Sequence, residues 1–328
     1  MNNIIDESIS SLNIAKMPKN AQEYRKFNSP NSDLNFVVDS VINKKATTAK
    51  GLNFNAVLDD NNDLTSLINH FKAWFRVYEK RPKAKIKLLC LPHAGGSASF
   101  FREWAHLMPS NIEVIVVQYP GHEDRIDEPL IDDMHDLVKS LAQACIHCNF
   151  INSEYMIFGH SMGGYIAWEL VQELQKLGAK LPSHMVVSGS EAPNLKNKGN
   201  WHKCADNILL NEINRLFSHS EALAENSEIS KMVLPIIRND YRLVETWEPD
   251  KLLNPLAVPI SAFYGQDDTE MTKEQAEGWH KLTTKTFDIK SWEGEHFYLI
   301  NHQNEVISNL VNIAKNIYRS TLTTFVLP

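Results

Sequence analysis

The segment around Ser161 restricts the possible folds of this 328-residue chain most, because an apolar run leads there into a Gly-x-Ser-x-Gly motif. The run at residues 155–158 is typical of a buried strand, and residues 165–177 place apolar side chains on one helical face. A serine held between a strand and a helix has a strained backbone, and the two glycines of the motif leave room for it. The pattern therefore predicts a sharp turn that raises the Ser161 hydroxyl clear of a sheet.

The rest of the chain from residue 86 onward alternates short apolar runs with amphipathic stretches. Further strands are expected at residues 86–91, 112–118, 184–190, 259–264 and 286–292. Further helices are expected at residues 100–108, 133–148, 273–282 and 304–318. Alternation of this kind predicts an α/β fold with a mostly parallel sheet and helices on both faces. Functional loops then lie at the carboxyl ends of the strands.

The first 80 residues have a different character. Residues 1–62 are rich in Asn, Ser and Asp, which is typical of a loosely structured, mobile tail. From Asp63 to Tyr78, large apolar residues recur at helical spacing, and this predicts an amphipathic helix. A wide apolar stripe invites aggregation if it stays exposed, so we expect this helix to pack against the body of the protein.

A serine hydroxyl is a poor nucleophile near neutral pH and needs a histidine base oriented by a carboxylate. In a sheet with such a serine turn, the acid and then the histidine follow later in the chain. His296 comes directly after the last expected strand and is the candidate base. The loop after residues 259–264 offers Asp268 and, as the less favoured alternative, Asp267. Three rival histidines lie in or near helices, or at the wrong end of a strand: His280, His302 and His184.

The same turn predicts where an oxyanion would rest. The backbone N–H of Met162, at the start of the helix after Ser161, points to that position. A second donor is expected from the loop after the first strand, residues 92–96, where glycines let the backbone approach a ligand. The N–H of Ala94 is the candidate.

Six short motifs together resemble those of the type II thioesterases that serve nonribosomal peptide and polyketide synthases. They are residues 92–96 (Pro-His-Ala-Gly-Gly), 120–125 (Pro-Gly-His-Glu-Asp-Arg), 159–164 (Gly-His-Ser-Met-Gly-Gly), 238–241 (Arg-Asn-Asp-Tyr), 265–268 (Gly-Gln-Asp-Asp) and 294–297 (Gly-Glu-His-Phe). The resemblance extends from about Trp74 to near the C-terminus. The residues before Trp74 are a departure, because members of that family usually begin near this point.

The resemblance implies an α/β-hydrolase fold and a serine hydrolase that cleaves acyl thioesters from the phosphopantetheine arm of carrier proteins. Such a protein edits or releases acyl chains, and its partners are the acyl or peptidyl carrier domains of a synthase. The resemblance also implies a helical lid, which maps to about residues 194–247. We accordingly expect an N-terminal extension at residues 1–72 and a thioesterase domain at residues 73–328.

Composition narrows the other possibilities. The formal net charge of −7 argues against a nucleic-acid partner, and no apolar run approaches the roughly 20 residues of a membrane span. Four cysteines in a chain without a recognisable export signal indicate reduced thiols and a cytoplasmic location. The chemistry proposed for Ser161 needs no metal or cofactor. The alternative interpretation is a small-molecule carboxylesterase or lipase-like hydrolase that uses the same Ser161, Asp268 and His296.

Overall fold

The computed structural model of the protein describes residues 70–216, 227–249 and 253–324. Within these ranges, seven strands form one sheet in the order β1-β3-β2-β4-β5-β6-β7. The six parallel strands are β2 (Ile86–Leu91), β3 (Ile112–Val117), β4 (Tyr155–His160), β5 (His184–Ser188), β6 (Ile260–Gly265) and β7 (Phe287–Trp292). The short edge strand β1 (Phe75–Arg76) pairs antiparallel with β3. The predicted mostly parallel sheet is confirmed.

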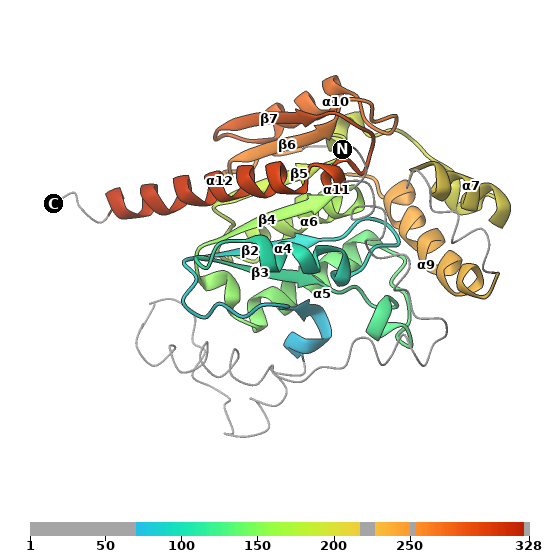
Figure 1. The fold of residues 1–328 in the computed structure, drawn as a ribbon, viewed down its shortest axis with the longest axis horizontal. Helices are drawn as coiled ribbons and strands as arrows, with labels where there is room; N and C mark the ends of the chain where they lie inside the picture. The colour runs from blue at the N-terminus through green and yellow to red at the C-terminus, as the bar shows by residue number, and fades with distance from the viewer. Residues whose placement is uncertain (1–69, 217–226, 250–252, 325–328) are drawn as a thin grey trace, which may run out of the picture.

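Helices cover both faces of the sheet (Figure 1). The helices of the body are α4 (Arg102–Leu107), α5 (Met134–His147), α6 (Met162–Lys176), α10 (Lys273–Glu277), α11 (Tyr298–Asn301) and α12 (Gln303–Thr324). Short 3₁₀ segments are η2 (Ala98–Phe101), η3 (Glu123–Arg125), η4 (Phe150–Asn152) and η7 (Gly278–Leu282). The stretch predicted as one helix at residues 273–282 is therefore α10 continued by η7.

Alternate residues of the central strands pack against different helices. In β2, Leu89 and Leu91 belong to the hydrophobic cluster that includes α5 and α6, whereas Leu88 and Cys90 belong to the cluster that includes α4 and α12. Successive side chains of a strand point to opposite faces, so a strand covered on both sides is apolar throughout. This explains why the parallel strands appear in the sequence as continuous apolar runs.

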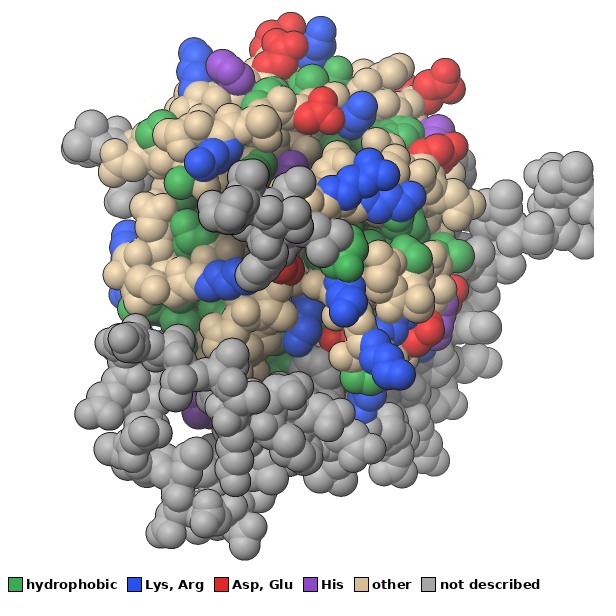
Figure 2. All heavy atoms as spheres, turned by 90° about the vertical axis from the view of Figure 1, so that its left-hand side faces the viewer, with side chains coloured by type: hydrophobic (Ala, Val, Ile, Leu, Met, Phe, Trp, Pro, Cys, Tyr) green, Lys and Arg blue, Asp and Glu red, His purple; other side chains and the backbone are tan. Residues whose placement is uncertain are grey.

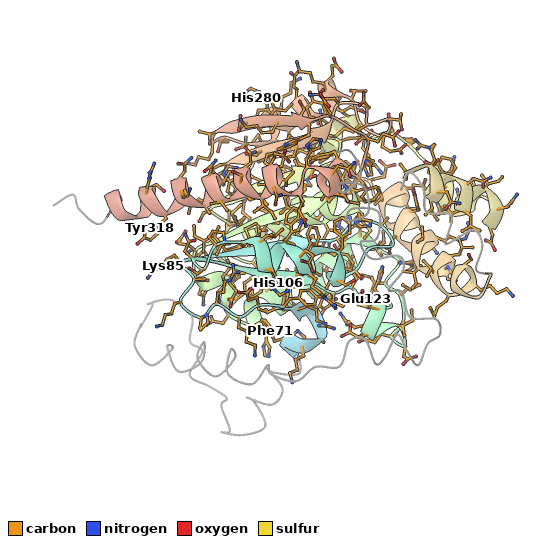
Figure 3. All side chains as sticks on the ribbon, viewed as in Figure 1. Phe71, Lys85, His106, Glu123, His280 and Tyr318 are labelled. Carbon is orange, nitrogen blue, oxygen red and sulfur yellow. The ribbon has the colours of Figure 1, made fainter. Side chains whose placement is uncertain are left out.

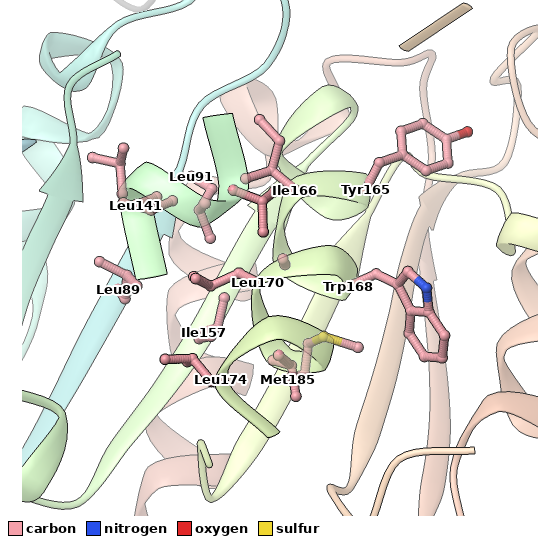
Figure 4. Close-up of a cluster of buried hydrophobic side chains, with 14 of the residues drawn as sticks. Leu89, Leu91, Leu141, Ile157, Tyr165, Ile166, Trp168, Leu170, Leu174 and Met185 are labelled. Carbon is pink, nitrogen blue, oxygen red and sulfur yellow. The ribbon is translucent and has the colours of Figure 1, made fainter. Parts of the chain in front are cut away.

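Helix α6 is anchored through its apolar stripe. Ile166, Leu170 and Leu174 are 0% exposed and lie over the sheet beside Ile157 and Met185 (Figure 4). Burial of each such side chain stabilises the fold by roughly 1.5–3 kcal/mol. The helix that follows Ser161 is therefore fixed firmly on the strands.

The N-terminal segment corrects one prediction. Residues 70–74 are helical, but the helix does not continue to Tyr78, because Phe75 and Arg76 form β1 and pair with β3. Phe71, Trp74 and Phe75 are all buried in the cluster that includes α5, and Figure 3 labels Phe71 on this segment. The described end of the apolar stripe thus packs on the body. Residues 1–69, including the expected mobile tail and the helix start at Asp63, lie outside the described residues.

The described part of the stretch between β5 and β6 contains several helical segments. It contains η5 (Pro193–Leu195), η6 (Trp201–Lys203), α7 (Asp206–Leu216) and α9 (Ser227–Thr246), with residues 217–226 and 250–252 outside the described ranges. Figure 1 shows α7 and α9 beyond the end of the sheet at which β4 leads into α6. We call residues 194–247 the lid segment, because the lid is predicted there.

The described surface carries both basic and acidic side chains (Figure 2). Figure 2 shows basic and acidic side chains interspersed over the described part of the face opposite the lid segment. Among the described residues, no helix is both long enough and apolar enough to cross a membrane.

Candidate active site

Ser161 occupies the turn between β4 and α6 with φ 53° and ψ −119°, a conformation that is strained for a residue with a side chain. Its N–H donates to the carbonyl of Ser188 over 2.7 Å, and its carbonyl accepts from Gly164 N–H over 2.8 Å. A Cβ added to Gly159 would lie 2.0 Å from the Gly163 carbonyl oxygen. Only glycine at position 159 lets strand and helix approach closely enough to hold this turn.

His296 and Asp268 meet at the carboxyl ends of β7 and β6. His296 Nδ1 lies 2.9 Å from Asp268 Oδ2, and the two side chains are 6% and 0% exposed. The other carboxylate oxygen of Asp268 accepts from the N–H of Glu270 over 2.9 Å. Asp267, in contrast, is exposed and accepts from the N–H of Gly294 over 3.1 Å. Of the two candidate acids, the structure brings Asp268 to His296.

The Ser161 turn and His296 are neighbours at this edge of the sheet. The ring of His160, which precedes the serine, has its centroid 5.1 Å from that of His296. Among the described residues, His296 forms a hydrogen bond with Asp268. The Ser161 hydroxyl forms none with His296 in this part of the chain. Catalytic hydrogen bonds of this kind commonly tighten only when substrate is bound.

The two candidate oxyanion donors come from adjoining segments. Met162 is the first residue of α6, and Ala94 lies in the loop directly after β2. Neither backbone N–H donates to an acceptor within residues 70–216, 227–249 and 253–324. A Cβ on Gly163 would lie 2.1 Å from the carbonyl oxygen of Leu91, so the serine turn and the loop after β2 are in direct backbone contact. Two unpaired N–H groups on adjoining backbones are what an oxyanion requires.

Two further histidines pack beneath the site in neutral form. Burial lowers the pKa of His93 to about 3, with a further contribution from the nearby His296 and His122. Its ring packs edge-on against Phe100 and Phe297, with centroids 4.7 and 4.8 Å away. Burial also holds the pKa of His160 well below its usual range. The geometry therefore gives these two rings a packing role.

The buried carboxylate of Asp240 was not identified as a site residue in the sequence analysis. Asp240 of α9 is 1% exposed, and its Oδ2 contacts His122 Nε2 at 2.9 Å and Gly95 N–H at 2.7 Å. Its only signal in the sequence was its membership of the motif at residues 238–241. The three residues come from segments far apart in the chain, so no local pattern could have brought them together.

The parallel sheet, the strained serine between β4 and α6, and the paired acid and histidine after β6 and β7 define the α/β-hydrolase fold. A family model described as the thioesterase domain matches residues 86–313. The chain belongs to this thioesterase family.

Proteins of known origin agree with this assignment. The gramicidin S biosynthesis protein GrsT of Aneurinibacillus migulanus is 31% identical over 243 residues, which are 74% of this chain and 94% of that protein. The type II thioesterase BorB from the borrelidin biosynthetic cluster has a TM-score of 0.67 at 33% identity, covering 74% of this chain and 97% of BorB. ClbQ, from the colibactin pathway that combines nonribosomal peptide and polyketide synthesis, has a TM-score of 0.68 at 29% identity, covering 72% and 100%.

Proposed function

We propose that this protein is a type II thioesterase that hydrolyses acyl groups from the phosphopantetheine arm of an acyl or peptidyl carrier protein. The observation that carries the proposal is the buried 2.9 Å contact between His296 and Asp268 beside the strained Ser161, in a chain of the thioesterase family. The relatives from biosynthetic clusters support a role in editing or release of acyl chains.

In the proposed mechanism His296 takes the proton of Ser161 as its oxygen attacks the thioester carbonyl carbon. The oxyanion accepts hydrogen bonds from the N–H groups of Met162 and Ala94, each typically worth about 3–4 kcal/mol of barrier. The C–S bond then breaks, and His296 gives its proton to the leaving sulfur, which departs as the pantetheine thiol. A water molecule, activated by the same histidine, releases the acid and restores Ser161.

Asp268 orients His296 in this mechanism. Asp268 accepts from the Nδ1–H of His296, which leaves Nε2 as the nitrogen that exchanges protons with Ser161. The N–H of Glu270 holds the carboxylate in place. Each step needs only side chains and backbone groups of this chain together with water, so we expect no resident metal or cofactor. Phosphopantetheine enters with the carrier protein.

The test compares substrates that carry the same acyl group. We expect kcat/KM to be at least about tenfold higher for an acyl carrier protein than for the corresponding free acyl-pantetheine thioester, with p-nitrophenyl esters poorer still. Equal values for carrier and free thioester, or a preference for the oxygen ester, would favour the carboxylesterase alternative. Ser161→Ala protein serves as the blank. The cytoplasmic location expected from the sequence stays a prediction, testable by cell fractionation.

A further inference from the structure

Asp240 joins the lid segment to the active site through a single carboxylate oxygen. Its Oδ2 accepts hydrogen bonds from the N–H of Gly95, at 2.7 Å, and from His122 Nε2, at 2.9 Å. Gly95 follows Ala94 in the loop after β2, and His122 lies in the loop after β3. One side chain of α9 therefore holds two loops at the carboxyl edge of the sheet.

The partner of this carboxylate is His122, whose two ring nitrogens both face acceptors. His122 Nδ1 lies 2.9 Å from the carbonyl oxygen of Pro120, and Nε2 faces Asp240 at 2.9 Å. A doubly protonated ring satisfies both contacts, because each nitrogen then donates to an acceptor. Burial by itself would lower the pKa of His122, but Asp240, together with the carbonyl of Pro120 and the nearby Glu123, raises it overall. Asp240 and His122, which are 1% and 3% exposed, are therefore placed to form a buried ion pair.

The same helix touches the loop at a second point. Gly95 has φ +71°, and a Cβ there would lie 2.6 Å from Cγ1 of Ile237, one helical turn before Asp240. Ile237 packs on the Cα of Gly95 while Asp240 holds its N–H. The adjacent N–H belongs to Ala94, which has no acceptor in the described part of the chain. The direction of that N–H depends on how α9 fixes the loop.

We propose that Asp240 is a positioning residue, which sets the direction of the Ala94 N–H by holding Gly95 and which relies on the His122 cation for its own place. The inference rests on the proposed function, because it assumes that Ala94 stabilises an oxyanion. It makes α9 a part of the oxyanion machinery in addition to its place in the lid segment.

Asp240→Asn is the variant that tests this role, since it keeps the side-chain shape and removes the charge that holds His122. Lys196→Met is the matched control: Lys196 donates to the carbonyls of Val244 and Trp247 at 2.6 and 2.9 Å and so anchors the C-terminal end of the same helix, through the helix backbone and not through the loop after β2. Turnover is measured per active site, counted by exhaustive labelling of Ser161 with a fluorophosphonate, so that unfolded protein does not contribute.

We expect Asp240→Asn to lower kcat per labelled site by about 10–100-fold with KM changed less than about threefold, because an oxyanion donor acts in the transition state. Lys196→Met should keep kcat within about threefold of wild type even where its melting temperature falls. Since Asp240 and His122 act as a unit, adding His122→Gln to Asp240→Asn should lower kcat little further.

A normal kcat per labelled site in Asp240→Asn would overturn the inference. So would a double variant, Asp240→Asn with His122→Gln, whose loss of kcat equals the product of the two single losses. If Asp240→Asn gives no labelled enzyme, His122→Gln alone must show the same loss of kcat with unchanged KM. The assays use an acyl carrier protein and p-nitrophenyl acetate in parallel, because the same oxyanion site serves both. Failure of the thioesterase proposal would appear as a wild-type protein inactive on the carrier, which is a separate result.

Discussion

Gly163 lies in close contact with the backbone of Leu91: a Cβ on the glycine would lie 2.1 Å from the carbonyl oxygen of the leucine. The contact joins the start of α6 to the end of β2 through backbone alone. Both candidate oxyanion donors, Met162 and Ala94, lie within three residues of one of these two. The spacing between the two donors is therefore set by a contact that only glycine permits.

Gly163→Ala should damage both the fold and the activity. The added methyl group meets backbone that cannot rotate away, so we expect a loss of about 3 kcal/mol in the free energy of unfolding and a fall in kcat of about a hundredfold. Gly178→Ala is the control, because Gly178 has φ +65° but no atom within 4 Å of its Cβ position. It should cost only about 1–2 kcal/mol and leave kcat unchanged. Urea unfolding and steady-state kinetics measure both, and equal effects of the two variants would contradict this account.

Asp268→Asn should lower kcat by about a thousandfold or more, because an amide in this place holds His296 in the wrong tautomer. Asp267→Asn should stay within about threefold of wild type, since that side chain is exposed and accepts a hydrogen bond from the Gly294 N–H, not from His296. Matching melting temperatures would show that both variants are folded. The reverse ranking of the two losses would move the acid by one residue.

Stability should fall in mild acid, in part through His184. Burial lowers the pKa of His184 to about 4, partly opposed by Asp288, and its Nε2 lies 2.8 Å from the Ser261 hydroxyl. Between about pH 6.5 and pH 4 the unfolded chain binds a proton at this site while the native state does not. The native state therefore gains the full benefit of a neutral His184 above about pH 6.5 and loses it between about pH 6.5 and pH 4. The loss in unfolding free energy amounts to roughly 3 kcal/mol.

Chemical unfolding of wild type and His184→Gln across this pH range tests the linkage. The variant should show a shallower decline in unfolding free energy, by close to one bound proton at pH 5. Parallel curves for the two proteins would show that the native state of His184 takes up the proton as readily as the unfolded chain does.

The N-terminal segment should be needed for the fold. Trp74 and Phe75 are 6% and 2% exposed, and the guanidinium of Arg125 lies 4.8 Å from the centre of the Trp74 ring. Deletion of residues 1–80 removes this burial, worth several kcal/mol, from a fold with about 5–15 kcal/mol in total. We expect a low soluble yield from that deletion and nearly normal hydrolysis of a small thioester from deletion of residues 1–62. If the protein lacking residues 1–80 has the same soluble yield and melting temperature as the full chain, the apolar stripe would instead bind a partner.

Much of the body could be predicted from the sequence, because its strands are continuous apolar runs and its helices have clear periodicity. The serine turn was visible for the same reason: the glycines in the Gly-x-Ser-x-Gly motif report a close backbone contact that is local in the chain. The loops with Asp268 and His296 followed from the rule that functional residues collect at the carboxyl ends of parallel strands.

The errors and omissions concern contacts between distant segments. Phe75 continues a helical apolar pattern, yet Phe75 and Arg76 pair with Val117 and Val116 at the sheet edge. Tertiary pairing here overrides the local preference. Asp240 reaches His122 across 118 positions of the chain. A carboxylate in an otherwise amphipathic helix does not reveal in advance which loop it will hold.

The most direct test of the central claim is intact-mass measurement of an acyl carrier protein incubated with this enzyme. Wild-type protein should convert the acyl carrier to its free-thiol form, with one acid released for each thiol, and Ser161→Ala should leave the carrier acylated at the uncatalysed rate. Loss of the acyl group at equal rates with both proteins would contradict the account, because Ser161 would then not be the nucleophile.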